Sequence, residues 1–212
     1  MRELFILLIS AWLYFSCHSY SDTANLRFRN ETVRLKHGLG LISLAIPSRF
    51  DTVLFWTRFS DCTSCGFEQI RFQRKNYPIF LESGFYWKGD PIDSVDEITI
   101  SQPREFFPPD TTIVISKSEH LLIVEEYDKD PQYFPVTGDT LMEINAKRYS
   151  IVFADHFDST SKVFQQTFVA QGRLKGNNIW IKFRHWARDK KSGKFYEECL
   201  HVMRSIRFVN GH

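Results

Sequence analysis

Residues 177–207, NNIWIKFRHWARDKKSGKFYEECLHVMRSIR, decide the fold, because the spacing of their apolar side chains changes once along the stretch. Ile179, Ile181 and Phe183 occupy every second position, and this period predicts a strand with one buried face. Beyond Gly193 the apolar residues recur three and four positions apart, at Phe195, Cys199, Val202, Met203 and Ile206. That spacing predicts an amphipathic helix whose apolar side packs on the sheet.

The same stretch predicts how this helix begins and which residues it exposes. Ser192 is the expected N-cap, because a serine hydroxyl can accept a hydrogen bond from the first backbone N–H groups of a helix. Glu197 and Glu198 follow in the first turn, where carboxylates complement the helix dipole. Glu198 and Arg204 lie off the apolar stripe, so we expect both to be exposed.

Upstream of this stretch, short alternating runs separated by turn residues predict a series of strands. The last third supplies three of them before 177–186, at residues 141–145, 148–157 and 162–174. Nearer the N-terminus, hairpins are expected from 32–35 with 39–46 and from 53–59 with 67–73. Further short strands are expected at 79–87, 97–101, 112–116 and 121–127. The predicted fold class is α+β, a mainly antiparallel twisted sheet with a C-terminal amphipathic helix packed on it.

The chain length suits a single folded unit after a leader. Residues 22–212 are long enough to bury a core as one domain. Proline, glycine and asparagine interrupt residues 75–110, which we expect to be an insertion. A net charge of +2 gives no indication of a nucleic-acid partner.

The first 21 residues predict a secretory signal peptide. The apolar run of residues 4–15 is long enough for the core of such a signal and too short to span a bilayer. Two cleavage sites are open, one before Cys17 and one after Ser21. The first would leave an acylated Cys17 that anchors the protein in a membrane, and the second would release it to the periplasm or the medium.

Two segments carry family resemblances. Phe15-Ser16-Cys17 resembles the cleavage boxes of bacterial envelope lipoproteins, which end in Ser-Cys after an aromatic or leucine run. The final strand and helix, closing with Met203-Arg204-Ser205-Ile206-Arg207-Phe208, resemble the end of PsbP-like α/β/α sandwich domains. The run LISLAIP at 41–47 is similar to the strand that opens those domains. The resemblance implies an envelope accessory or binding domain, because that fold usually serves as a scaffold for partners.

Cys62 and Cys65 are the candidate reactive pair. Two thiols at this spacing can form a redox-active pair or a small structural disulfide. A redox pair opens a helix, whereas residues 67–73 alternate like a strand, which favours a turn of a hairpin. A zinc site would also need Cys199 and His201, which a helix would point about 200° apart. We therefore expect no metal, no cofactor and no catalytic residue.

Two polar clusters have simpler explanations. Asp155, His156, Asp158 and Ser159 bring carboxylates, an imidazole and a hydroxyl close together. Neighbours on a strand point to opposite faces, however, so a polar strand end entering a turn is expected. Basic residues interleaved with Trp180 and Trp186 can contact an anionic membrane surface or an envelope polysaccharide, or form a solvated strand face. They are Lys182, Arg184, Arg188, Lys190 and Lys191.

Together these patterns predict an exported, lipid-anchored binding or structural module of a bacterial cell envelope. Its expected partners are the membrane, through acylated Cys17, and an envelope protein or polysaccharide, with no nucleic acid. Two alternatives remain open, a thiol-disulfide oxidoreductase that uses Cys62 and Cys65 and an accessory subunit of an envelope complex.

Overall fold

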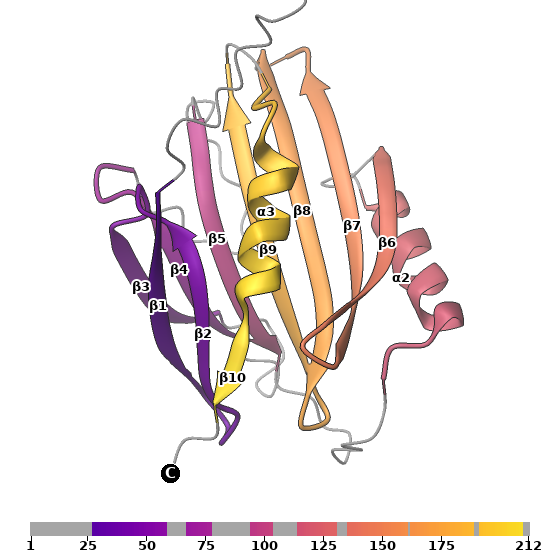
Figure 1. Ribbon diagram of the computed structural model, residues 1–212. Coiled ribbons are helices and arrows are strands. Elements are labelled where there is room, and N and C mark those ends of the chain that lie inside the picture. Colours follow the sequence, from indigo (N-terminus) through magenta and orange to yellow (C-terminus); the bar gives the residue numbers. More distant parts are fainter. Residues whose placement is uncertain are drawn as a thin grey trace, which may run out of the picture.

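The computed structural model describes residues 27–58, 67–77, 94–103, 114–130, 135–160, 162–188 and 191–209. Within these ranges the strands form two antiparallel sheets (Figure 1). The small sheet has the order β1-β2-β10, with β1 at Phe28–Leu35, β2 at Gly40–Pro47 and β10 at Arg207–Val209. The large sheet has the order β3-β4-β5-β9-β8-β7-β6. Its strands are Thr52–Arg58, Phe67–Gln73, Ser94–Pro103, Asn177–Ala187, Val163–Leu174, Lys147–Asp158 and Val136–Ile144, in that order.

The main core lies between the large sheet, the small sheet and helix α3, Phe195–Ser205. Figure 1 shows α3 crossing in front of β8 and β9, beside the small sheet. The stripe that sequence spacing identified on this helix, Phe195 to Ile206, is buried. The prediction of an α+β fold with its C-terminal helix packed on an antiparallel sheet is confirmed. We call the face of the large sheet under α3 the core face.

One contact in this core leaves no room for a side chain. Gly172 on β8 lies under the ring of Tyr149 on β7, and both are buried. A Cβ atom added at Gly172 would come within 2.6 Å of two carbons of that ring. The glycine is therefore required by close packing across the two strands.

A second helix packs on the opposite face, which we call the second face. This helix, α2 at Lys117–Lys129, packs Ile123 against Val152 of β7, whereas Ile151 belongs to the main core. Neighbours on a strand point to opposite faces, so α2 and α3 lie on different sides of the sheet. The strand expected at 121–127 is wrong. Ser116 caps the helix by accepting a hydrogen bond from the Glu119 N–H at 3.1 Å, and the apolar run of residues 121–124 suits a helix as well as a strand.

The start of α3 differs from the expectation. Its N-cap is Lys194, which makes no side-chain cap bond, whereas the Ser192 N–H donates to Gln166 Oε1 at 2.7 Å. Glu198 is 8% exposed rather than on the surface, and Arg204 is exposed as expected. The early part of the helix is therefore held by contacts with the sheet, and the Glu198 carboxylate must have a partner in the interior.

The segment expected to be an insertion, residues 75–110, contains a strand of the large sheet. Ser94–Pro103 within it forms β5, which pairs with β4 on one side and β9 on the other. This strand joins the two halves of the large sheet and belongs to the fold itself. Residues 78–93 and 104–113, with the strand expected at 79–87, lie outside the described residues, as does the leader, so the boundary at residue 21 stays a prediction.

Candidate functional site

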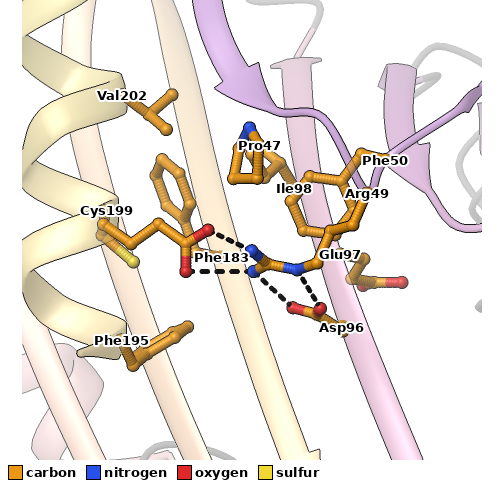
Figure 2. A pocket seen from close by; sticks show the side chains of 11 residues that line it. Pro47, Arg49, Phe50, Asp96, Glu97, Ile98, Phe183, Phe195, Cys199 and Val202 are labelled. Atoms are coloured by element: carbon orange, nitrogen blue, oxygen red, sulfur yellow. Dashed lines mark hydrogen bonds and ion pairs between the residues drawn. The ribbon is translucent and has the colours of Figure 1, made fainter. Parts of the chain in front are cut away.

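The densest cluster of charge on the core face centres on Arg49. This residue follows β2 in a turn, and its guanidinium reaches Asp96 on β5 and Glu198 on α3 (Figure 2). Nε donates to Asp96 Oδ2 at 2.6 Å and Nη2 donates to Glu198 Oε2 at 3.0 Å, while Nη1 donates to Glu198 Oε1. His185 Nδ1 lies 3.8 Å from Asp96 Oδ1 on the neighbouring strand. One guanidinium therefore joins a turn, a strand and a helix.

The charges of this cluster stabilise one another. Burial alone would raise the pKa of Asp96, but hydrogen bonds from His185 and Arg49 outweigh it and hold that pKa below its ordinary value. Burial also opposes the charge on Arg49, yet its bonds to Asp96 and Glu198 raise its pKa. The Cys199 thiol beside them has a pKa well above its ordinary value because it is buried and close to Glu198. A thiol in this state is not a nucleophile.

A small pocket opens beside the cluster. Pro47, Phe183, Phe195, Cys199 and Val202 form its apolar lining, and Arg49, Asp96 and Glu198 form its polar side (Figure 2). The space inside it that a water-sized molecule can occupy is about 10 Å³, roughly enough for one water and far below the roughly 300–1,000 Å³ of typical ligand sites. The arrangement therefore fastens the helix to the sheet and is not a site for an organic ligand.

A serine, a histidine and an aspartate meet under α2. His120 Nδ1 lies 2.7 Å from Ser150 Oγ, and Nε2 lies 3.0 Å from Asp139 Oδ1. Such a chain can activate a serine for nucleophilic attack. Here, however, Ser150 is 1% exposed and His120 is 6% exposed, so no substrate can reach the hydroxyl. The chain of contacts holds α2 against β6 and β7. No local pattern in the sequence indicates this cluster, because its three residues lie on separate elements.

A buried polar strip crosses the second face of the sheet. Arg71 on β4 is 1% exposed, and its Nε lies 3.1 Å from Oε2 of Glu97 on β5. Its guanidinium also lies 4.6 Å from the centre of the Trp56 ring. Arg184 on β9 approaches the other oxygen of Glu97 at 3.5 Å. Gln69, Gln73, Thr99 and Ser101 complete the strip, and all are buried.

The predicted basic cluster lies partly beside this strip and partly beyond the end of β9. Lys182 and Arg184 point to the second face and are only partly exposed, Arg184 at 13% of its side chain. Arg188 is exposed just beyond β9, and Lys191 is exposed and bonds Asp155 at 2.8 Å. Lys190 lies outside the described residues. The structure therefore separates the cluster into an inner pair and an outer group at the end of β9.

The next candidates are the three cysteines singled out in the sequence, for lipid attachment and for a reactive pair. Cys17, Cys62 and Cys65 are outside the described residues. The strands before and after the cysteine pair, β3 and β4, form an antiparallel hairpin in which residue 58 lies opposite residue 67. The hairpin predicted for 53–73 is confirmed by this pairing.

Two further expectations are confirmed by geometry. On α3, Cys199 is buried and His201 is exposed, so the two residues point apart. Asp158 Oδ1 accepts a hydrogen bond from the Thr160 N–H at 2.9 Å, so the cluster around His156 is the polar end of a strand entering a turn.

Within the described ranges there is neither a helix long and apolar enough to cross a membrane nor a group of three or more His, Cys, Asp or Glu side chains that could hold a metal ion. No family model matches the chain, and no curated protein matches it. Among solved structures, the crystal structure of LpqN, involved in cell envelope biogenesis of Mycobacterium tuberculosis, matches with a TM-score of 0.44 and 11% identity. The match covers 86% of this chain and 92% of that one.

Proposed function

We propose that this protein is an exported, lipid-anchored module of a bacterial cell envelope that binds or supports a partner. The leader supports export, and Ser16-Cys17 supports an acylated N-terminus. The likeness of the final strand and helix to PsbP-like scaffold domains favours a binding role.

The β3–β4 hairpin is the observation that favours a binding module over an oxidoreductase. Strand β4 begins at Phe67, two residues after Cys65, and is paired with β3 along its whole length. A redox thiol needs the N-terminus of a helix or a nearby cation to lower its pKa. A strand begins where the helix of a redox motif would run, so Cys62 and Cys65 are better placed to close a hairpin turn.

The buried clusters support the same proposal. The groups that resemble catalytic machinery are buried within the fold: Ser150 bonded to His120, and the Cys199 thiol beside Glu198. They fasten the two helices to the sheet. The surface of the protein is therefore the part available for its function.

A series of contacts places the start of the described chain at the same end of the molecule as the end of β9. The Arg27 carbonyl accepts a hydrogen bond from the Ser48 N–H at 2.7 Å. The next residue, Arg49, binds Asp96, which lies opposite His185, two residues before the end of β9. Figure 1 shows the tip of β9, the turn after β7 and the first turn of α3 together at the top of the view.

This end presents the exposed basic group. Arg188, Lys191 and Lys162 are exposed here, and Phe157 beside the β7–β8 turn is 42% exposed. The ten residues from Cys17 to Arg27 span at most about 35 Å when extended, so an acylated Cys17 keeps this end near the membrane. We place the contact with anionic headgroups or envelope polysaccharide at Arg188, Lys190 and Lys191. An envelope protein docked beside it would make the chain an accessory subunit.

The anchor can be tested by fractionation and mass spectrometry. We expect the wild-type protein in the membrane fraction, with an N-terminal peptide that starts at Cys17 and carries lipid. Cys17→Ala should move the protein to the soluble fraction, whereas Ser21→Lys, which blocks the other cleavage site, should leave it anchored. An unmodified N-terminus at Asp22 in the wild type would refute the anchor.

The contact surface can be tested by sedimentation with phosphatidylglycerol vesicles and with insoluble envelope polysaccharide. Arg188→Ala combined with Lys191→Ala should lower binding to one of these severalfold. Lys36→Ala is the control, because it lies in the β1–β2 turn, whose Gly38 carbonyl contacts Lys175 at the far end of β8. Equal binding by wild type and the double variant would show that the basic group is not the contact surface.

A further inference from the structure

Phe157 and Phe164 form an aromatic pair beside the β7–β8 turn, outside the main core. The two residues lie directly opposite each other in the register of the strands, and their ring centres are 4.6 Å apart. Phe157 is 42% exposed, whereas Phe153, on the same face nearer the centre of the sheet, packs against the main core. The pair therefore presents apolar surface at one end of the sheet.

The turn that carries this pair is ordered before any partner binds. Asp158 Oδ1 accepts a hydrogen bond from the Thr160 N–H at 2.9 Å. Val163, directly opposite Asp158, is 2% exposed and fixes the other side of the turn. Because these residues are already held in place, a contact made here would lose little conformational entropy.

Exposed cations lie at the same end of the molecule, each beyond the end of a different strand. They are Arg27 before β1, Lys75 after β4, Lys162 in the β7–β8 turn and Arg188 after β9. The Lys75 N–H donates to Asp51 Oδ1 at 2.6 Å, which places the end of β4 beside the Arg49 turn. None of the ion pairs among the described residues involves Arg27, Lys75 or Lys162. Asp51 and Glu197 are exposed at this end, and among the described residues the cations outnumber them.

We propose that this end is a membrane-contact surface, where the Phe157–Phe164 pair enters the boundary between headgroups and acyl chains and the surrounding cations bind anionic headgroups. The inference rests on the proposed lipid anchor and deepens the proposed function, because it names the bilayer as the ligand of the basic end. Apolar side chains among cations match the two layers of an anionic bilayer, in which charged headgroups cover an apolar interior. A purely charged polymer would use the cations and leave the aromatic pair in water.

The chain before β1 also favours the bilayer. The Arg27 carbonyl accepts a hydrogen bond from the Ser48 N–H at 2.7 Å, so the described chain starts at this end. The ten residues from Cys17 to Arg27 reach at most about 35 Å. Acyl chains on Cys17 would therefore hold the aromatic pair close to the bilayer, at an effective concentration on the order of millimolar. Under that condition a weak surface contact is sufficient to fix the orientation of the protein.

The first test is sedimentation of the Cys17→Ala chain with vesicles, because without acyl chains only the surface contact is measured. We expect phosphatidylglycerol vesicles to bind it severalfold more than phosphatidylcholine vesicles. In about 1 M NaCl, where charges are screened beyond about 3 Å, the remaining binding would come from the aromatic pair. Phe157→Ser should lower that remaining binding at least about fivefold. Phe55→Ser, at an exposed phenylalanine on β3, is the matched control and should leave it unchanged.

The second test measures whether residue 157 reaches the acyl chains. Phe157→Trp and Phe55→Trp each add one tryptophan at an exposed site. Lipids brominated on their acyl chains quench tryptophan fluorescence on contact, so the acylated variants are compared in brominated phosphatidylglycerol vesicles, with the wild type as background. We expect the added tryptophan to be quenched more strongly at 157 than at 55. Equal quenching at the two positions would overturn the proposal.

The outcomes separate this inference from the proposed function. Loss of vesicle binding by Arg188→Ala with Lys191→Ala, together with wild-type binding by Phe157→Ser, would keep the basic surface and refute entry of the aromatic pair. A Phe157→Ser variant that loses polysaccharide binding and keeps vesicle binding would assign this end to the polysaccharide and also refute the inference. An unmodified N-terminus would refute the anchor alone, because the vesicle test uses a chain without lipid. Circular dichroism and thermal unfolding show whether each variant is folded.

Discussion

The Arg49 guanidinium donates two hydrogen bonds to the Glu198 carboxylate, although the two residues lie 149 positions apart in the chain. The same guanidinium donates to both oxygens of Asp96, so a single cation is shared by a strand and a helix. Arg49 is about a quarter exposed, whereas both carboxylates are buried. The acids therefore depend on Arg49 more than Arg49 depends on them.

Removal of Arg49 should destabilise the protein strongly. Arg49→Ala leaves Glu198 buried without its cation and leaves Asp96 with only Arg74 and His185, each 3.8 Å away. Breaking a buried pair in this way costs about 3–5 kcal/mol, and solvent access at Arg49 places this case near the lower figure. Urea unfolding of Arg49→Ala, Glu198→Gln and the double variant gives the coupling energy between the two residues. A coupling below about 0.5 kcal/mol would show that the contact contributes nothing to stability.

The low pKa of Asp96 makes stability depend on acid pH. Because its folded pKa lies below its unfolded value of 3.8, the unfolded chain binds more protons between the two values. The contribution of Asp96 is therefore present above about pH 4 and is lost as the pH falls through the folded pKa. Urea unfolding from pH 6 to pH 2 should show this loss in the wild type and a shallower loss in Asp96→Asn. Parallel curves for the two proteins would contradict the assignment.

Gly172→Ala should destabilise the protein by about 1–3 kcal/mol or more, because the new methyl group would overlap the Tyr149 ring in a closely packed core. Gly193→Ala is the control, since a Cβ at that position meets nothing within 4 Å. Thermal unfolding of both variants measures the difference. Equal melting temperatures would mean that the Tyr149 ring moves aside at little cost.

The helix stripe makes a comparable prediction. Phe195 is 4% exposed on the core face, so Phe195→Ala should cost about 3–5 kcal/mol through lost transfer energy and a cavity. Arg204→Ala, on the exposed side of the same helix, should change the free energy of unfolding by less than about 0.5 kcal/mol.

The cysteine pair should behave as ordinary thiols. We expect alkylation of the reduced protein across pH to show Cys62 and Cys65 titrating near 8.5, the unperturbed value, because a hairpin turn provides no helix dipole. Cys199 should stay unmodified until the protein unfolds, since it is 2% exposed. An apparent pKa below about 7 at Cys62, with turnover of a disulfide substrate, would favour the oxidoreductase.

Sequence spacing was sufficient to predict the helices and strands that bury a single face, because their apolar residues then recur with one regular period. The apolar stripe from Phe195 to Ile206 and the alternation in β9 are both of this kind. The same logic failed for Glu198, because its partner Arg49 comes from a distant turn that no local pattern indicates. It also failed for 121–127, where the apolar run of residues 121–124 has neither period.

The polar strip on the second face was missed for a related reason. In β4 the residues FEQIRFQ read as apolar on one side and polar on the other, which predicts a solvated second face. Arg71 and Glu97 are instead buried there and paired with each other. Alternation shows which side chains share a face, but only tertiary structure shows whether that face is covered.

The position of β5 has a consequence for how the chain acquires its structure. Strands β6 to β9 pair with their neighbours in sequence, and so do β3 to β5, but the two groups meet only where β5 pairs with β9. Likewise, β2 receives β10, formed by residues 207–209, as its second neighbour. Because a chain is synthesised from its N-terminus, the first five strands must wait for residues 177–209 before either sheet is complete. A chain truncated before residue 177 should therefore keep open sheet edges and aggregate, even though most of its strands are present.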